Sequence, residues 1–135
     1  MTKTQLKHIF LLGLGISGMS LALHLKKKGV SCFCWDDDLK IRETALERRI
    51  ALEDVSEKIL RKCNLLVLSP GINHQKLHPH KAVKIANSLK IKIITDLEFL
   101  NILEYKNTLV GVTGTNGKSS TTHFMEKIIS NKNNF

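Results

Sequence analysis

Short apolar runs alternate with longer amphipathic stretches along most of the chain. The runs of strand length lie at residues 8–12, 30–35, 65–69, 91–95 and 109–113. Stretches with helical spacing of apolar residues lie at 17–28, 40–50, 79–90, 97–105 and 118–130. Ser56 followed by Glu57 predicts the start of a further short helix. This alternation is typical of a parallel sheet built from βαβ units, so it predicts an α/β fold.

Two residues mark predicted helix ends. Gly29 follows the first helical stretch, where a left-handed glycine commonly ends a helix. Pro79 begins a later one, where its missing N–H costs nothing. We expect residues 1–96 to form a Rossmann-like domain and residues 97–135 to begin a second domain, truncated after its first strand, glycine loop and helix.

Composition supports a globular protein. The chain has 135 residues, of which 42% are hydrophobic and 24% charged, with only 2 Pro and 8 Gly, which is wrong for a disordered chain. The apolar run near the amino terminus is too short for a signal peptide or a membrane span, so we expect a cytoplasmic protein without membrane contact. Cys32, Cys34 and Cys63 lack zinc-type spacing and are expected to be buried, reduced thiols.

The formal net charge of +9 raises the question of nucleic-acid binding, because a basic surface gains affinity by releasing counterions from phosphates. The lysines and arginines, however, are spread over all predicted helices, and no aromatic residues alternate with them. Their run at residues 26–28 ends a helix, where cations interact favourably with the helix dipole. We therefore expect solvated helix faces and an anionic small-molecule substrate, and no nucleic-acid partner.

The first glycine loop is a G-x-G-x-x-G at residues 13–18, between a predicted strand and a helix. Gly13 permits the tight turn, Gly15 lets the backbone approach a diphosphate, and Gly18 lets the helix pack on the strand. Asp36, at the end of the second strand, stands where such folds place the acid that meets a ribose or base. The motif indicates a diphosphate-bearing ligand; NAD and a purely structural turn remain alternatives.

The second glycine loop, at residues 113–119, ends in Gly-Lys-Ser and again joins a strand to a helix. In a P-loop the backbone N–H groups wrap the phosphates, Lys118 reaches the β and γ oxygens, and the Ser119 hydroxyl ligates Mg²⁺. The strict pattern has glycine at position 112, where this chain has Val112. The loop predicts ATP and Mg²⁺ as cofactors.

Together the two loops resemble the Mur ligase family. Thr-Gly-Thr-Asn-Gly-Lys-Ser at 113–119 resembles that family's ATP loop, which lacks the same leading glycine. Gly-Leu-Gly-Ile-Ser-Gly at 13–18, Ser-Pro-Gly-Ile at 69–72 and Thr-Asp-Leu-Glu at 95–98 resemble, in order and spacing, its D-glutamate-adding branch. The L-alanine-adding branch stays an alternative, although it usually has a Gly-Gly pair in the first loop and no Ser-Pro-Gly-Ile.

The resemblance implies a role for individual residues. The UDP part of the substrate would meet Gly13, Gly15, Ile16, Ser17, Gly18, Asp36, Asp37, Ser69, Pro70 and Gly71. ATP would meet Gly114, Thr115, Asn116, Gly117, Lys118, Ser119 and Ser120, with Lys118 catalytic and Ser119 holding Mg²⁺. The implied reaction belongs to peptidoglycan precursor synthesis: the L-alanine carboxylate of UDP-N-acetylmuramoyl-L-alanine is phosphorylated, and the amine of D-glutamate attacks the acyl phosphate.

The remaining ligase machinery follows the P-loop in relatives, so we expect these 135 residues to be inactive alone. Alternatives are a non-catalytic UDP-sugar-binding module, one half of a split ligase, and part of an NAD-dependent dehydrogenase. Self-association is also expected, because the strand at 109–113 and the helix side chains Phe124, Ile128 and Ile129 would otherwise be uncovered. His74, His78 and His80 fit no compact metal motif and are expected in a solvated loop.

Overall fold

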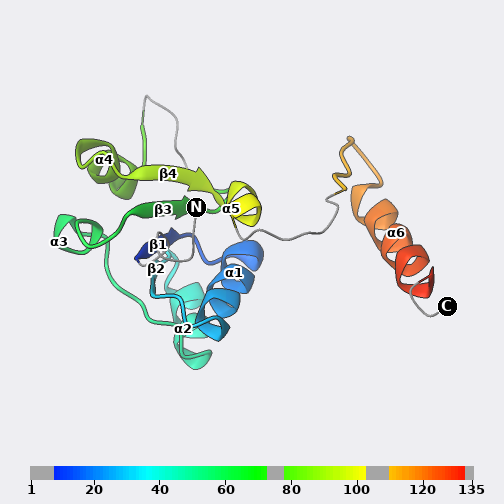
Figure 1. The fold of residues 1–135 in the computed structure, drawn as a ribbon, viewed down its shortest axis with the longest axis horizontal. Helices are drawn as coiled ribbons and strands as arrows, with labels where there is room; N and C mark the ends of the chain where they lie inside the picture. Colours follow the sequence, from blue (N-terminus) through cyan, green and yellow to red (C-terminus); the bar gives the residue numbers. More distant parts are fainter. Residues whose placement is uncertain (1–7, 73–77, 103–109, 133–135) are drawn as a thin grey trace. The chain divides into compact units, whose positions relative to one another are not determined.

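The computed structural model describes residues 8–72, 78–102 and 110–132. The chain divides into two compact units, Met1–Tyr105 and Lys106–Phe135, which we describe separately (Figure 1). The first contains strands β1 (Ile9–Leu12), β2 (Cys32–Trp35), β3 (Leu65–Leu68) and β4 (Lys92–Thr95), and helices α1 (Ile16–Lys27), α2 (Leu39–Glu47), α3 (Glu57–Leu60), α4 (Lys81–Ser88) and α5 (Asp96–Ile102). The second contains helix α6 (Lys118–Lys132).

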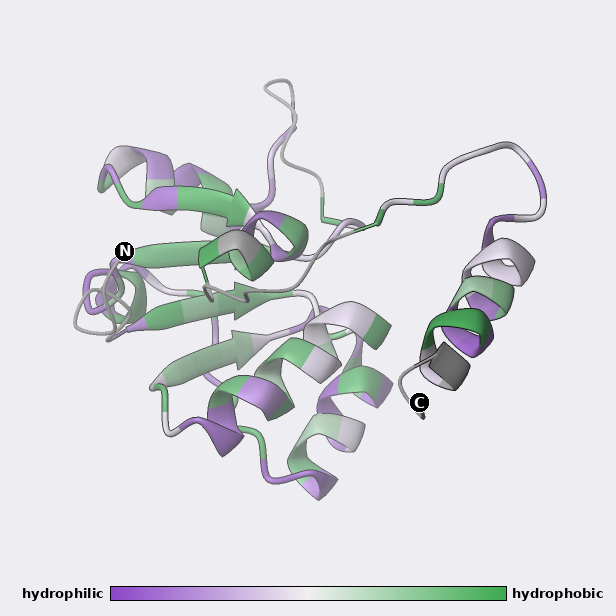
Figure 2. Cartoon of the chain, turned by 45° about the vertical axis from the view of Figure 1, so that its right-hand side comes forward, coloured by the Kyte–Doolittle hydropathy of each residue, from purple (hydrophilic) through white to green (hydrophobic). Residues whose placement is uncertain are grey.

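The four strands of the first unit form one parallel sheet in the order β2-β1-β3-β4. Successive side chains of a strand point to opposite faces. Ile9 and Leu11 of β1 therefore pack with α1, whereas Phe10 and Leu12 pack on the other face with α3 and α4. In Figure 2 the apolar strands lie between helices whose outer faces are hydrophilic. The expected α/β class and parallel sheet are confirmed.

Helix ends follow the local sequence. Gly29 adopts a φ of +67° after α1, as predicted for a left-handed glycine. The Ser56 hydroxyl accepts a hydrogen bond from the N–H of Ile59, 3.4 Å away, and so caps α3. Lys26, in the last turn of α1, donates from Nζ to the carbonyl oxygens of Arg48 and Arg49 at 3.1 and 2.8 Å. This lysine thus satisfies carbonyls just after α2.

Helix α5 packs onto the first unit. Phe99 is fully buried with the side chains of α1 and the sheet. Thr95 and Glu98 form a capping box, in which Thr95 Oγ1 accepts from the Glu98 N–H and Glu98 Oε2 accepts from the Thr95 N–H. The Thr95 N–H, helped by the Thr95 hydroxyl, lowers the pKa of the Glu98 carboxyl. The domain boundary after Asp96 stays a prediction, but the structure adds α5 to what the first unit contains.

Two predicted details are wrong. Helix α4 begins at Lys81 with His80 as its N-cap, so Pro79 precedes the helix instead of occupying its first position. The fifth strand, expected at 109–113, is not formed in residues 110–113, and residue 109 lies outside the described residues. A strand needs a neighbour for its backbone N–H and C=O groups, and residues 110–113 pair with no strand that the structure describes.

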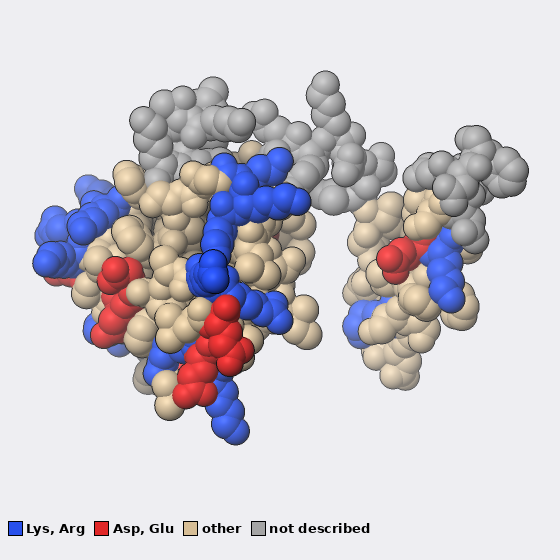
Figure 3. All heavy atoms as spheres, turned by 90° about the horizontal axis from the view of Figure 1, so that it is seen from below, with Lys and Arg blue, Asp and Glu red and all other residues tan. Residues whose placement is uncertain are grey.

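Charge on the first unit is mixed. On the face shown in Figure 3, lysine and arginine side chains form separate clusters with acidic and uncharged atoms between them. Within the described residues, no helix combines the length and apolar character that crossing a membrane requires.

We predict that a chain of residues 1–105 folds cooperatively, whereas a chain of residues 1–96 is less stable by at least about 3 kcal/mol, because it lacks the buried Phe99 side chain. Urea denaturation followed by circular dichroism measures the difference. Equal stability of the two chains would contradict this assignment of α5.

Point substitutions supply the control. Phe99→Ala in the 1–105 chain should cost about 3–5 kcal/mol. Leu97→Ala, on the same helix but 68% exposed, should change the free energy of unfolding by less than about 0.5 kcal/mol.

Candidate functional site

The first glycine loop is held by close backbone contacts between β1, α1 and β3. Gly13 adopts a φ of +90°, and a Cβ there would lie 2.8 Å from Ser69 Cβ. A Cβ on Gly18 would lie 2.0 Å from the carbonyl oxygen of Gly13. No side chain fits at either position without moving the backbone. These two glycines therefore allow α1 to start directly against the end of the sheet.

Gly15 differs from both. A Cβ built on it meets no atom within 4 Å, and its φ of −58° is open to any residue. It precedes α1 as a cap without a side-chain hydrogen bond, and the first turn of α1 contains no acidic residue. The first N–H groups of a helix have no intrahelical acceptor and carry a partial positive charge. The space beside Gly15 and the exposed Ile16 and Ser17 thus adjoins a helix end suited to an anion.

Asp36 and Ser69, which are predicted to contact the substrate, also hold the first glycine loop in place. Asp36 Oδ2 accepts from the Leu14 N–H at 2.6 Å, and its Oδ1 accepts from the Asp38 N–H at 2.9 Å. The buried Ser69 hydroxyl donates to the carbonyl oxygen of Gly13 at 2.8 Å. Each carboxylate or hydroxyl oxygen keeps further lone pairs. The predicted ligand roles of Asp36 and Ser69 remain predictions, and the structure gives both residues a second role in fixing the loop.

Asp37 faces away from the loop anchor and is joined to α4. Its Oδ2 lies 3.0 Å from His80 Nε2, while His80 Nδ1 accepts from the Ala82 N–H at 3.0 Å. Because Nδ1 accepts a backbone proton, the imidazole is in the tautomer that carries its proton on Nε2 and donates it to Asp37. The sequence pattern placed His80 in a solvated loop, and nothing in it indicated this helix cap or the link to Asp37.

Arg42 of α2 stabilises the segment that follows β2. Its guanidinium donates to the carbonyl oxygens of Asp36 and Asp37 at 2.7 and 2.9 Å, and its Cζ lies 4.6 Å from the centroid of the Trp35 ring. An arginine over an indole face gains a cation–π interaction. The end of β2 is therefore held by a residue that motif analysis did not single out.

A cavity of about 560 Å³ opens beside the loop, between α1 and α2. Gly15 and Ile16 border it on the loop side, and Lys40 and Arg48 of α2 also line it. A cavity that joins a helix amino terminus to two cationic side chains suits an anionic ligand. The Ser-Pro-Gly-Ile segment at residues 69–72 contributes less to this candidate site. Pro70 and Gly71 are exposed after β3, and the Ile72 N–H donates to the carbonyl oxygen of Ser69 at 3.0 Å, which closes a turn.

The second glycine loop lies in the second unit, directly before α6. Gly114 and Gly117 have φ values of +154° and +76°, so both use the left-handed region that favours glycine. The Lys118 ammonium donates to the carbonyl oxygen of Gly114 across the loop. Thr115, Asn116, Ser119 and Ser120 are exposed. The loop and the following helix thus occur where predicted; their roles toward ATP and Mg²⁺ stay predictions.

In the described residues, no three His, Cys, Asp or Glu side chains are grouped so that they could hold a metal ion. His74 lies outside the described residues. Cys34 and Cys63 are buried and Cys32 is half-buried, all as free thiols. The hydrogen bond with Cys34 and burial raise the pKa of Cys32, and burial raises the pKa of Cys63 to about 11. Cys32 and Cys63 are therefore protonated near neutral pH.

Comparison with known proteins decides the family. A family model described as the amino-terminal domain of MurD-like Mur ligases matches residues 7–95. The chain belongs to this family. The MurD-like assignment confirms the resemblance that the motifs predicted. The chain is 35% identical over 123 residues to a UDP-N-acetylmuramoylalanine–D-glutamate ligase of Paramagnetospirillum magneticum, covering 91% of this chain and 27% of the relative.

A second relative supports the same family, and one solved structure supports the fold. The corresponding ligase of the Wolbachia of Brugia malayi is 33% identical over 132 residues, which cover 96% of this chain and 26% of the relative. The structure of a murein peptide ligase from Psychrobacter arcticus superposes with a TM-score of 0.63 at 22% identity, covering 86% of this chain and 25% of that one. The chain spans about a quarter of the length of the curated relatives it matches.

The loop geometry predicts very different losses of stability when one methyl group is added at Gly18 or at Gly15. Gly18→Ala should destabilise the first unit by at least about 3 kcal/mol, because the new Cβ would overlap the Gly13 carbonyl. Gly15→Ala should cost no more than about 1 kcal/mol, the difference between glycine and alanine as a helix N-cap. Urea denaturation measures both, and similar losses for the two variants would show that the loop is packed differently.

Proposed function

We propose that this MurD-like chain is part of a ligase that joins D-glutamate to UDP-N-acetylmuramoyl-L-alanine in peptidoglycan precursor synthesis, and that its first unit holds the UDP end of that substrate. The observation that carries the proposal is the division of roles in the first glycine loop. Gly13 and Gly18 are closed by packing, and Gly15 alone faces free space at a helix amino terminus. The D-glutamate ligases among the relatives support the substrate.

The diphosphate would lie against the backbone N–H groups of Ile16 and Ser17, where the dipole of α1 favours negative charge. Lys40 and Arg48, which line the adjoining cavity, add positive charge on the same side. The uridine would extend toward Asp36 and Asp37 at the end of β2, and the muramoyl arm toward Ser69, Pro70 and Gly71. Asp36 is held by two backbone N–H groups, so its carboxylate is already oriented before a ligand arrives.

The second unit is proposed to begin the ATP-binding domain. Residues 114–120 would wrap the ATP phosphates, Lys118 would neutralise charge on the transferring phosphoryl group, and the Ser119 hydroxyl would be one ligand of Mg²⁺. Support comes from the left-handed glycines at both ends of the loop and from α6 starting at Lys118. Mg²⁺ supplies charge neutralisation between the β and γ phosphates when bound.

Gly15→Val tests the UDP site. The branched side chain would occupy the space proposed for the diphosphate, and its Cβ would meet no protein atom within 4 Å, so UDP affinity should fall at least about 10-fold with little loss of folding stability. Isothermal titration with UDP and, in parallel, NADH measures the effect. Gly111→Val is a matched control, since a Cβ at that position also meets nothing and Gly111 belongs to the other unit.

Unchanged UDP affinity in Gly15→Val, or tighter binding of NADH than of UDP by the unaltered chain, would contradict the proposed site. The second outcome would favour a dinucleotide-binding role instead.

These 135 residues tested alone should release no ADP from ATP, Mg²⁺, UDP-N-acetylmuramoyl-L-alanine and D-glutamate. Phosphoryl transfer requires in-line positioning and a complete Mg²⁺ shell, to which the loop contributes one hydroxyl. A coupled assay for ADP provides the measurement. Substrate-dependent ADP release that disappears in Lys118→Ala would show that the chain is a complete catalyst.

A further inference from the structure

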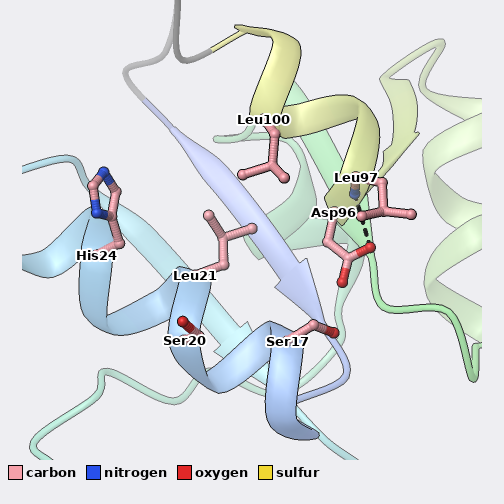
Figure 4. Close-up of a pocket in the computed structure, with 7 residues that line it drawn as sticks. All are labelled: Ser17, Ser20, Leu21, His24, Asp96, Leu97 and Leu100. Carbon is pink, nitrogen blue, oxygen red and sulfur yellow. Dashed lines mark hydrogen bonds between the residues drawn. The ribbon is translucent and has the colours of Figure 1, made fainter. Parts of the chain in front are cut away.

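A second cavity, of about 300 Å³, lies between α1 and α5. Three leucines supply its aliphatic walls: Leu21 from α1, and Leu97 and Leu100 from α5. Ser17 and Ser20 contribute hydroxyl groups, and Asp96 contributes a carboxyl group. Figure 4 shows Leu21 of α1 and Leu100 of α5 pointing toward one another, with the oxygens of Ser17 and Asp96 at the same end.

Asp96 carries an unpaired carboxylate oxygen in this cavity. The residue is only 5% exposed. Its Oδ1 accepts from the Leu97 N–H at 2.9 Å, whereas Oδ2 is out of contact with solvent and has no hydrogen-bond partner among the described residues. Capping of α5 does not account for this oxygen, since Thr95 and Glu98 already form the capping box.

Buried polar groups in folded proteins are nearly always hydrogen-bonded, and a buried charge without a partner is costly. A donor brought to Oδ2 would therefore form a strong, charge-assisted hydrogen bond. Because the oxygen is enclosed, neighbouring side chains have to shift for a donor to reach it, and the donor has to be small. An ammonium group is compact, positively charged and carries three N–H donors. The leucine walls suit a short alkyl chain attached to it.

We propose that the α1–α5 cavity binds a small aliphatic ammonium ligand, with Asp96 Oδ2 accepting a hydrogen bond from the ammonium group and the three leucines contacting its alkyl chain. A metal ion fits these walls poorly, because the cavity pairs Asp96 with hydroxyls, aliphatic carbons and a single imidazole, that of His24, instead of further carboxylates. The ligand differs in charge from the anionic substrate proposed for the glycine loop, although Ser17 adjoins both sites and Ser20 lines both cavities.

The test uses n-butylammonium chloride as the probe and n-butanol as its neutral counterpart, with NaCl added to equalise ionic strength. Titration of the ¹⁵N-labelled chain, followed by amide chemical shifts, should show saturable changes centred on Ser20, Leu97 and Leu100. The ammonium compound should bind at least about 10-fold more tightly than the alcohol, because hydrogen bonds to charged groups are the strong ones.

Asp96→Asn keeps the shape of the side chain and removes its charge, so it should reduce that preference to within about 2-fold. Glu98→Gln is the control: it removes an exposed carboxylate two residues away, and glutamine also serves in capping boxes, so the preference should persist. Equal affinity for the two probes, a preference that survives in Asp96→Asn, or shifts scattered over other acidic residues would overturn the proposal.

Ser20→Leu provides a second variant in case Asp96→Asn does not fold by circular dichroism. Ser20 is exposed on α1 and lines the cavity, so a leucine there should fill the opening and abolish binding of both probes while Asp96 remains. Undiminished binding of the ammonium compound by this folded variant would place the ligand elsewhere and overturn the proposal.

Discussion

The first unit depends on one close approach of backbone to backbone, at the point where β1 turns into α1. The absence of side chains at Gly13 and Gly18 lets the helix start within contact distance of the loop carbonyl, and the Ser69 hydroxyl ties that carbonyl to the end of β3. The Asp36 carboxylate ties the next residue, Leu14, to the end of β2. Three neighbouring strands therefore converge on a single loop, and the amino terminus of α1 is aimed outward from the sheet edge.

This convergence explains why a phosphate-binding loop and a structural turn can share one motif. Two of the three glycines are required by packing and would be required in any protein with this turn. The third, Gly15, is not required by packing; as the N-cap of α1 it is only modestly favoured, which leaves room for the ligand contact that we propose. A preformed, rigid loop also loses little conformational freedom when a ligand binds. The anchoring roles of Asp36 and Ser69 would thus favour the proposed binding without any direct contact with substrate.

Much of this arrangement could be predicted from the sequence because it is encoded locally. Apolar runs such as Ile9–Leu12 are buried on both faces. The first glycine loop joins the strand and the helix that its motif specifies, and the second lies directly before its predicted helix. What could not be predicted depends on partners distant in the chain. The contact of His80 with Asp37 spans 43 residues, and nothing near either residue marks it. The prediction of a fifth strand was wrong for a related reason. The β-propensity of residues 110–113 produces a strand only when another strand lies beside it.

The two edges of the sheet have a consequence for behaviour in concentrated solution. Beyond β2, residues 51–53 pair with Cys34, whose N–H donates to the Ala51 carbonyl and whose carbonyl accepts from Glu53. At the other edge, β4 is only four residues long and begins with the exposed Lys92. Covered edges, and short edges with a lysine, discourage strand addition from a second molecule. The sheet of the first unit should therefore resist edge-to-edge aggregation.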